Sequence, residues 1–169
     1  MVAVMYMNDS VRKQNRLQEY DYATAGAYFI TICTKDRADI LSKIRIVGEG
    51  LCALPHVELT DVGKMVEQSI QYIDRTIPGF SVDRYVIMPN HVHLLITLSA
   101  IPETGGHRGP PLHKVIGQFK SYTTHTYGRV LWQRSYHDHV IRGEQDYRDV
   151  WEYIDQNPAR WREDELYTL

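Results

Sequence analysis

Two histidines separated by one residue are the first feature of this sequence that could do chemistry. His91 and His93 lie at the start of an apolar run, residues 91–98 (HVHLLITL). Alternate side chains on a β-strand share a face, so both imidazoles would point the same way, with their Cα atoms about 6.6 Å apart. Two imidazoles at that spacing can hold one divalent metal ion. The alternative is that they only decorate a polar face of a sheet.

A second pair with the same spacing is formed by His137 and His139, but an aspartate lies between them. The apolar pattern of a buried strand fails there, and we predict an ordered loop. A contact from His139 to a phosphate, or to a group beside the metal, is left open.

A tyrosine followed four residues later by an asparagine is the third feature, formed by Tyr153 and Asn157. Residues four apart stack on one face of a helix. A phenol hydroxyl is a workable nucleophile when a cation holds the target phosphate, and an amide oxygen one turn away can complete the ligand set of that cation. The chain has 12 tyrosines, so a packed and hydrogen-bonded ring is the alternative for Tyr153.

A sheet and a helix are needed to position these side chains, and hydrophobic patterning predicts both. Strands are predicted where β-branched and aromatic residues gather, over residues 27–34, 80–88 and 91–98. Apolar residues at helical spacing predict one helix between a Thr60 cap and Pro78, and others over residues 112–123 and 144–156. Residues 35–50 are interpreted as a loop with a short element around 39–46, and residues 132–140 as a short strand or ordered loop.

These elements predict a single domain over residues 1–169 of the α+β class. Its antiparallel sheet would carry helices packed on one face, and a ferredoxin-like arrangement fits the order of elements. Residues 1–25 are predicted to form an N-terminal arm. Residues 99–112, which are rich in glycine and proline, are predicted to form a flexible loop.

Composition narrows the class of protein. Hydrophobic residues make up 43% and charged residues 24% of the chain, as in ordinary globular domains. The net charge of −2 and the pI of 6.4 argue against a general nucleic-acid binder, although local basic clusters matter more than the sum. Cys33 and Cys52 have neither disulfide nor zinc-ribbon spacing, and Cys33 is predicted to lie in the core. We find no membrane-spanning run and no signal peptide, and expect a cytoplasmic protein.

Five segments at compatible spacings carry a family resemblance. They are residues 28–31 (YFIT), 88–95 (MPNHVHLL), 119–121 (FKS), 132–142 (WQRSYHDHVIR) and 153–158 (YIDQNP). Together they resemble the REP-associated tyrosine transposases, relatives of the single-tyrosine insertion-sequence transposases of the HUH endonuclease type. The similarity covers about residues 10–160 in the family's order.

The resemblance implies that Tyr153 is the nucleophile and that His91, His93 and Asn157 bind Mg²⁺ or Mn²⁺. It further implies that single-stranded or hairpin DNA is cut through a 5′-phosphotyrosine and rejoined. Related enzymes often use glutamine where this chain has the shorter Asn157. Related enzymes also include homodimers in which the tyrosine helix serves the partner's metal site, so a homodimer is left open. The candidate DNA contacts are basic residues of two of these segments, namely Lys120, Arg134, His139 and Arg142.

Two other functions are left open. The first is a non-catalytic module that binds hairpin DNA on the same fold, with His91 and His93 retained as structural residues. The second is a metal-dependent hydrolase of small phosphoesters, which is disfavoured because few acidic residues lie near the histidine motif and because Tyr153 would have no role.

Overall fold

A computed structural model describes residues 24–48, 54–100 and 111–167 of the chain. Most of the predicted N-terminal arm (1–25) and most of the predicted loop (99–112) lie outside the described residues, as does Cys52. Cys33 is described and is 4% exposed, which confirms its predicted place in the core.

The described part contains six strands, three α-helices and two short 3-10 helices. The strands are β1 (Gly26–Cys33), β2 (Ser42–Val47), β3 (Leu54–Leu59), β4 (Phe80–Ile87), β5 (His91–Leu98) and β6 (His137–Val140). The helices are α1 (Asp61–Thr76), α2 (Leu112–Tyr127) and α3 (Glu144–Gln156), with η1 (Lys35–Arg37) and η4 (Asn157–Glu163) between or after them. All three predicted strands and all three predicted helices are present.

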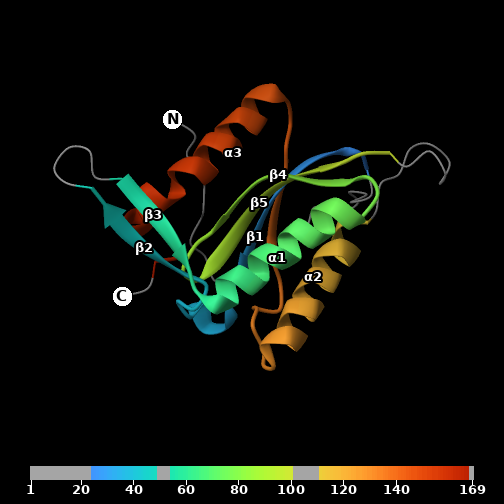
Figure 1. The fold of residues 1–169 in the computed structure, drawn as a ribbon. Coiled ribbons are helices and arrows are strands. Elements are labelled where there is room, and N and C mark those ends of the chain that lie inside the picture. The colour runs from blue at the N-terminus through green and yellow to red at the C-terminus, as the bar shows by residue number, and fades with distance from the viewer. Residues whose placement is uncertain (1–23, 49–53, 101–110, 168–169) are drawn as a thin grey trace, which may run out of the picture.

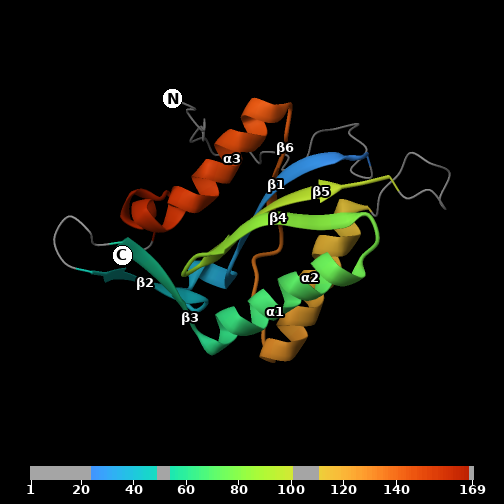
Figure 2. The same cartoon turned by 45° about the horizontal axis from the view of Figure 1, so that its top comes forward.

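Four strands form one antiparallel sheet in the order β4-β5-β1-β6, so the histidine-bearing β5 is central. Helices α1 and α2 cover one face of this sheet, and α3 lies across the other (Figures 1 and 2). The predicted α+β class with an antiparallel sheet is therefore confirmed. The expectation of helices on one face holds for α1 and α2 only, because β5 is buried on both faces and each face needs a cover.

The two faces of β5 belong to two separate hydrophobic clusters. The larger cluster, under α1 and α2, takes the even-numbered residues of the strand, which are Val92, Leu94, Ile96 and Leu98. The smaller one, under α3, contains Leu95 with Ile154 and Trp161. Alternation along one strand thus places His91 and His93 on the same face as Leu95, opposite the residues of the larger cluster.

Helix α1 shows how closely the elements approach one another. The Thr60 hydroxyl accepts a hydrogen bond from Gly63 N at 3.1 Å, which confirms the predicted N-cap. Position 63 must be glycine, since a β-carbon there would collide with the carbonyl oxygen of Leu41. The helix ends at Thr76, before Pro78 as predicted.

The sequence predictions for two weaker strands were only partly right. The short element predicted around residues 39–46 is β2, but its pairing with β3 in a two-stranded ribbon was not predicted. Of the strand and the loop left open for residues 132–140, the strand is present as β6, paired with β1, so the ordered loop favoured around His137 and His139 was wrong. An edge strand needs partners on one side only and tolerates polar side chains, which is why the apolar pattern was missing.

Candidate metal centre and tyrosine helix

His91 and His93 lie beneath α3 and the segment that follows it, so they do not decorate an open polar surface. Their side chains are 0% and 2% exposed, and their ring centroids are 4.4 Å apart. The ring of Trp161 in η4 lies 5.8 Å from that of His91, and Tyr167 packs on Trp161 at 5.2 Å. The end of the chain therefore covers the histidine pair.

Hydrogen bonds orient both rings through their Nδ1 atoms. His91 Nδ1 is 2.9 Å from Asn90 Oδ1, and the Asn90 amide nitrogen donates to the carbonyl oxygen of Leu166 at 2.8 Å. Because that nitrogen is already engaged, Asn90 offers its oxygen to His91, whose Nδ1 must carry the proton. The Nε2 atom of the neutral His91 ring then holds a free lone pair. His93 Nδ1 is held at 2.8 Å by the Thr31 hydroxyl.

Three buried polar atoms at this site have no hydrogen-bond partner among the described residues: His91 Nε2, His93 Nε2 and Asn157 Oδ1. Leaving a polar atom buried and unpaired costs about 1–3 kcal/mol. Three such atoms in the residues predicted as ligands suit a bound cation, which would engage all of them. The residues therefore fit a divalent metal ion.

Asp164 joins this group, and sequence reasoning missed it. Its Oδ2 accepts a hydrogen bond from Asn157 Nδ2 at 2.9 Å, which leaves the amide oxygen of Asn157 as the unpaired atom. One ligand atom from each of His91, His93 and Asp164 lies within 4.8 Å of the others. Two ligands on opposite sides of an ion at about 2.1 Å are about 4.2 Å apart, so this cluster is close to the size that one ion needs.

Burial keeps both imidazoles neutral. Loss of solvent lowers the pKa of His91 to about 4, with Asp164 opposing the shift and Arg37 adding to it. Burial, followed by the neighbouring His91, holds the pKa of His93 well below its usual value. Both rings are thus in the form that can bind a metal at neutral pH.

Tyr153 lies beside this pair in the same chain. Its ring centroid is 5.3 Å from that of His93 and 5.8 Å from that of Phe29, and its side chain is partly exposed. Ile154, 1% exposed, anchors α3 to the sheet. Asn157 follows α3 in helical conformation, so it keeps the predicted spacing of one turn from Tyr153.

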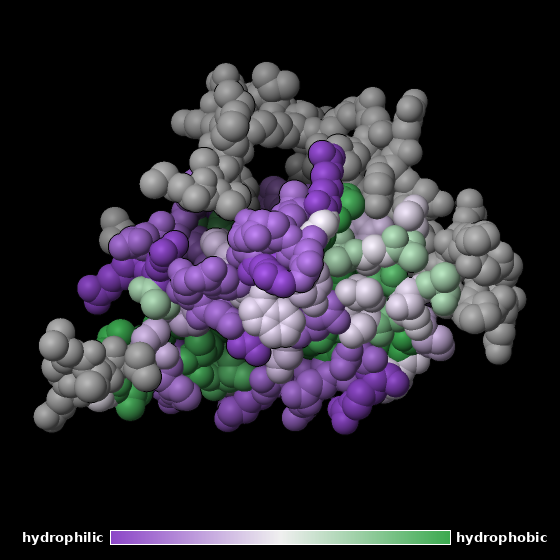
Figure 3. Space-filling model, turned by 90° about the horizontal axis from the view of Figure 1, so that it is seen from above, coloured by the Kyte–Doolittle hydropathy of each residue, from purple (hydrophilic) through white to green (hydrophobic). Residues whose placement is uncertain are grey.

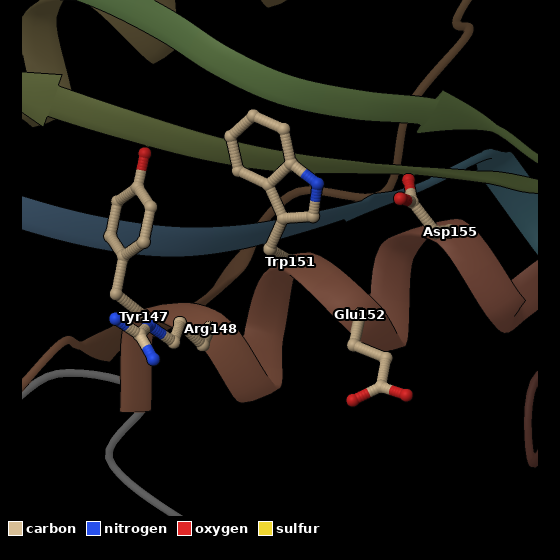
Figure 4. Close-up of a pocket in the computed structure, with 5 residues that line it drawn as sticks. All are labelled: Tyr147, Arg148, Trp151, Glu152 and Asp155. Atoms are coloured by element: carbon tan, nitrogen blue, oxygen red, sulfur yellow. The ribbon is translucent and has the colours of Figure 1, made fainter. Parts of the chain in front are cut away.

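A second tyrosine on α3, Tyr147, occupies a different environment. It lines a pocket of about 310 Å³ together with Arg148, Trp151, Glu152 and Asp155 (Figure 4). Its hydroxyl donates to the carboxylate of Asp83 at 2.9 Å. Burial and that carboxylate raise the pKa of Tyr147 to about 12. Neither Tyr153 nor the histidines line this pocket, which is separate from the candidate metal centre.

The turn η1 brings a cation to the same end of the sheet. Asp36 and Arg37 both have left-handed backbone conformations, with φ of 56° and 53°. Non-glycine residues rarely adopt this conformation, which often accompanies functional sites. The Arg37 guanidinium contacts the carbonyl oxygen of Glu165 at 3.4 Å and lowers the pKa of His91. Sequence reasoning missed Arg37 because nothing in the linear pattern links residue 37 to residue 91.

The four candidate DNA contacts differ in their surroundings. Lys120 donates to three carbonyl oxygens, those of Gln133, Arg134 and Ser135, at 2.7, 3.0 and 3.2 Å. Its ammonium group therefore holds the segment before β6, which is a structural task. Arg134 itself is exposed.

His139 and Arg142 lie near the start of α3. In β6, His139 pairs with Phe29 of β1, and directly paired residues share a face of the sheet, so His139 is on the Tyr153 side. Its Nε2 is 3.0 Å from the Asp146 carboxylate, which also accepts from Arg142 N at 2.7 Å. The side of the molecule on which α3 lies is mostly hydrophilic (Figure 3).

Comparisons with known proteins identify relatives. An uncharacterised protein of Haemophilus influenzae is 32% identical over 178 aligned residues, which cover 92% of this chain and 93% of that protein. The REP-associated tyrosine transposase of Escherichia coli is 27% identical over 140 residues, covering 82% of this chain and 70% of that protein. No family model matches the chain.

A solved structure of a REP-associated tyrosine transposase bound to a REP hairpin has the same fold. The TM-score is 0.62 at 24% sequence identity, over 86% of this chain and 73% of that chain. Within the described residues, no helix combines the length and apolar character needed to cross a membrane.

Proposed function

We propose that this chain, a REP-associated tyrosine transposase-like protein that belongs to one family with the Haemophilus influenzae relative, cuts and rejoins single strands of DNA. The reaction is metal-dependent and proceeds through a covalent link between Tyr153 and a 5′ phosphate. His91, His93 and Asn157 hold the metal ion, and Mg²⁺ or Mn²⁺ is the expected cofactor.

One observation carries this proposal. Buried ligand atoms on β5 and at the end of α3 have no hydrogen-bond partner among the described residues, and the Tyr153 ring lies 5.3 Å from one of the imidazoles that bear them. If the histidines had only a structural role, those atoms would stay buried without a hydrogen bond, which lowers the stability of the fold. A phosphate held at the same place would lie near the phenol.

A bound divalent ion would supply Lewis acidity and neutralise charge that develops on the phosphate. The residues of the chain do the rest. Asn90 and Thr31 hold the two imidazoles in fixed orientations through their Nδ1 atoms. The packing of Ile154 holds the tyrosine helix against the sheet. These contacts fix the site before DNA arrives, which reduces the entropic cost of the reaction.

Tyr153 supplies the nucleophile. Its phenolic oxygen forms a bond to phosphorus, the bond from phosphorus to the 3′ oxygen breaks, and the phenol loses its proton. The departing oxygen takes up a proton and becomes a free 3′-OH. Rejoining is the reverse reaction, and it needs no ATP because the phosphotyrosine bond keeps the energy of the original linkage.

The nature of the substrate is supported by the relatives. The solved relative is bound to a REP hairpin, and from this we infer that hairpin or single-stranded DNA is the partner of the present chain. Arg134, His139 and Arg142 are proposed to contact it. For Lys120, its three carbonyl partners make a structural role the better interpretation.

Tyr153→Phe tests the proposal, with Tyr147→Phe as a matched control on the same helix. Labelled hairpin oligonucleotides with single-stranded flanks are incubated with Mn²⁺ or Mg²⁺, and products are separated on denaturing gels. We expect the wild type and Tyr147→Phe to form a protein–DNA adduct that Tyr153→Phe cannot form, while all three bind the DNA equally. Cleavage by Tyr153→Phe would exclude this tyrosine as the nucleophile. Binding without cleavage by the wild type, across many hairpins and both metals, would favour the non-catalytic module.

The arrangement also bears on oligomeric state. Because Tyr153 and His93 of one chain are adjacent, a monomer can assemble the site without a tyrosine from a partner. The homodimer and the cytoplasmic location remain predictions. Light scattering of the purified chain, alone and with hairpin DNA, tests whether the protein forms a homodimer.

A further inference from the structure

We propose that Asp164 is a fourth ligand of the metal ion, so that the segment after the tyrosine helix completes the metal centre. This inference rests on the proposed function, which assigns a metal ion to His91, His93 and Asn157. It adds an anionic ligand from a part of the chain that lies beyond every motif recognised in the sequence.

The geometry of the cluster carries the inference. A carboxylate oxygen of Asp164 and one nitrogen from each of His91 and His93 are within 4.8 Å of one another. The two imidazole Nε2 atoms and the Asn157 amide oxygen are buried without partners among the described residues, so the surroundings of the carboxylate suit a cation. A carboxylate is also the oxygen ligand that Mg²⁺ and Mn²⁺ prefer.

Asp164 keeps the capacity to bind an ion while it makes its present contacts. Oδ2 accepts one hydrogen bond from Asn157 Nδ2, and Oδ1 accepts one from Leu166 N at 2.7 Å. An ionised carboxylate offers about four lone-pair positions, so roughly half of them stay available. The same side chain can therefore orient the Asn157 amide and ligate the ion.

Charge gives a further reason for an acidic ligand. Two neutral imidazoles and a neutral amide would leave the full double charge of the ion in a buried place, which is unfavourable. One carboxylate halves that charge.

The segment that bears Asp164 is held in place on both sides of that residue. The carbonyl oxygen of Leu166 accepts from the Asn90 side chain, and the Trp161 ring lies against His91.

Metal binding, measured without reference to activity, tests the role of Asp164. The full chain is stripped of metal with a chelator, and its affinity for Mn²⁺ is obtained from the loss of the free-ion electron paramagnetic resonance signal. The variants are Asp164→Asn and Asp164→Glu, with the neighbouring exposed Glu163→Gln as the control. We expect Asp164→Asn to weaken Mn²⁺ binding roughly 10–100-fold, Asp164→Glu to weaken it less, and Glu163→Gln to leave it unchanged.

Asparagine keeps one oxygen, which can accept from Asn157 although the hydrogen bond from Leu166 N is then lost. A residue that only positions Asn157 would therefore keep that task in Asp164→Asn. Wild-type affinity in that variant would therefore overturn the inference and leave the proposed function intact. No Mn²⁺ binding by the wild type would overturn the metal centre itself. Should Asp164→Asn fail to fold, infrared difference spectra of the wild type on addition of Mg²⁺ decide the question. A shifted carboxylate band supports the ligand, and an unchanged carboxylate region, as expected of a ligand set of imidazoles and amide alone, rejects it.

Discussion

Acid should destabilise the metal-free protein through its two buried histidines. Burial lowers the folded-state pKa of His91 to about 4 and holds that of His93 well below its usual value, so the unfolded chain takes up protons first as the pH falls. The stabilisation is fully present above about pH 6.5, the usual pKa of histidine, and is lost as the pH falls from there through the folded-state pKa.

The size of the effect follows from the shift of His91. With pKa values of about 6.5 unfolded and about 4 folded, His91 alone accounts for a loss of about 2 kcal/mol of unfolding free energy at pH 5 relative to neutral pH. His93 acts in the same direction. Against a typical total of about 5–15 kcal/mol, such a loss is readily measured.

Urea denaturation in the presence of a chelator, at about pH 7.5 and about pH 5, measures this loss for the wild type and for His91→Asn. The amide nitrogen of an asparagine at position 91 can replace the Nδ1–H donor to Asn90, so the variant keeps that hydrogen bond. His113→Asn, at an exposed position on α2, is the control. Between these two pH values, we expect the unfolding free energy of the wild type and of the control to fall by about 2 kcal/mol more than that of His91→Asn. Equal acid losses in all three proteins would refute the argument that burial keeps His91 neutral.

Two further predictions concern the scaffold. Gly63→Ala should lower the unfolding free energy by about 1–3 kcal/mol or more in urea denaturation, because its β-carbon meets the carbonyl oxygen of Leu41; an unchanged midpoint would contradict this close approach. Lys120→Met should reduce stability by on the order of 2 kcal/mol, as three carbonyl oxygens lose a charged donor, while affinity for hairpin DNA and its salt dependence stay near wild type. Unchanged stability with weaker binding and a shallower salt dependence would instead make Lys120 a phosphate contact.

Local patterning was enough to predict the elements that bear the candidate site. Alternation along residues 91–98 placed both histidines on one face of a strand, and the larger hydrophobic cluster contains the residues predicted for the other face. The spacing from Tyr153 to Asn157 predicted one turn of a helix, and the structure keeps that spacing. These features depend on the period of a strand or a helix, which a sequence displays directly.

Features that depend on distant contacts could not be predicted in this way. Asp164 reaches the histidines because the chain turns back after α3, and no spacing rule joins residue 164 to residue 91. The strand β6 pairs along one edge only, so His137 and His139 carry no apolar pattern to reveal it. The ribbon of β2 and β3 was not predicted, because these two strands pair only with each other and form a sheet separate from the main one.

The residues just before the histidines show that a candidate metal motif extends beyond its proposed ligands. The carbonyl oxygen of Pro89 accepts from Leu41 N at 2.9 Å, and that of Asn90 accepts from Thr34 N at 2.8 Å, so this turn is fastened to two other segments. The Asn90 side chain then joins His91 Nδ1 to the carbonyl oxygen of Leu166. One turn thus sets the tautomer of a histidine and the position of the chain end that carries Asp164. The orientation of the proposed ligands therefore depends on the turn as much as on the imidazoles, which is the physical reason for treating residues 88–93 as a single unit.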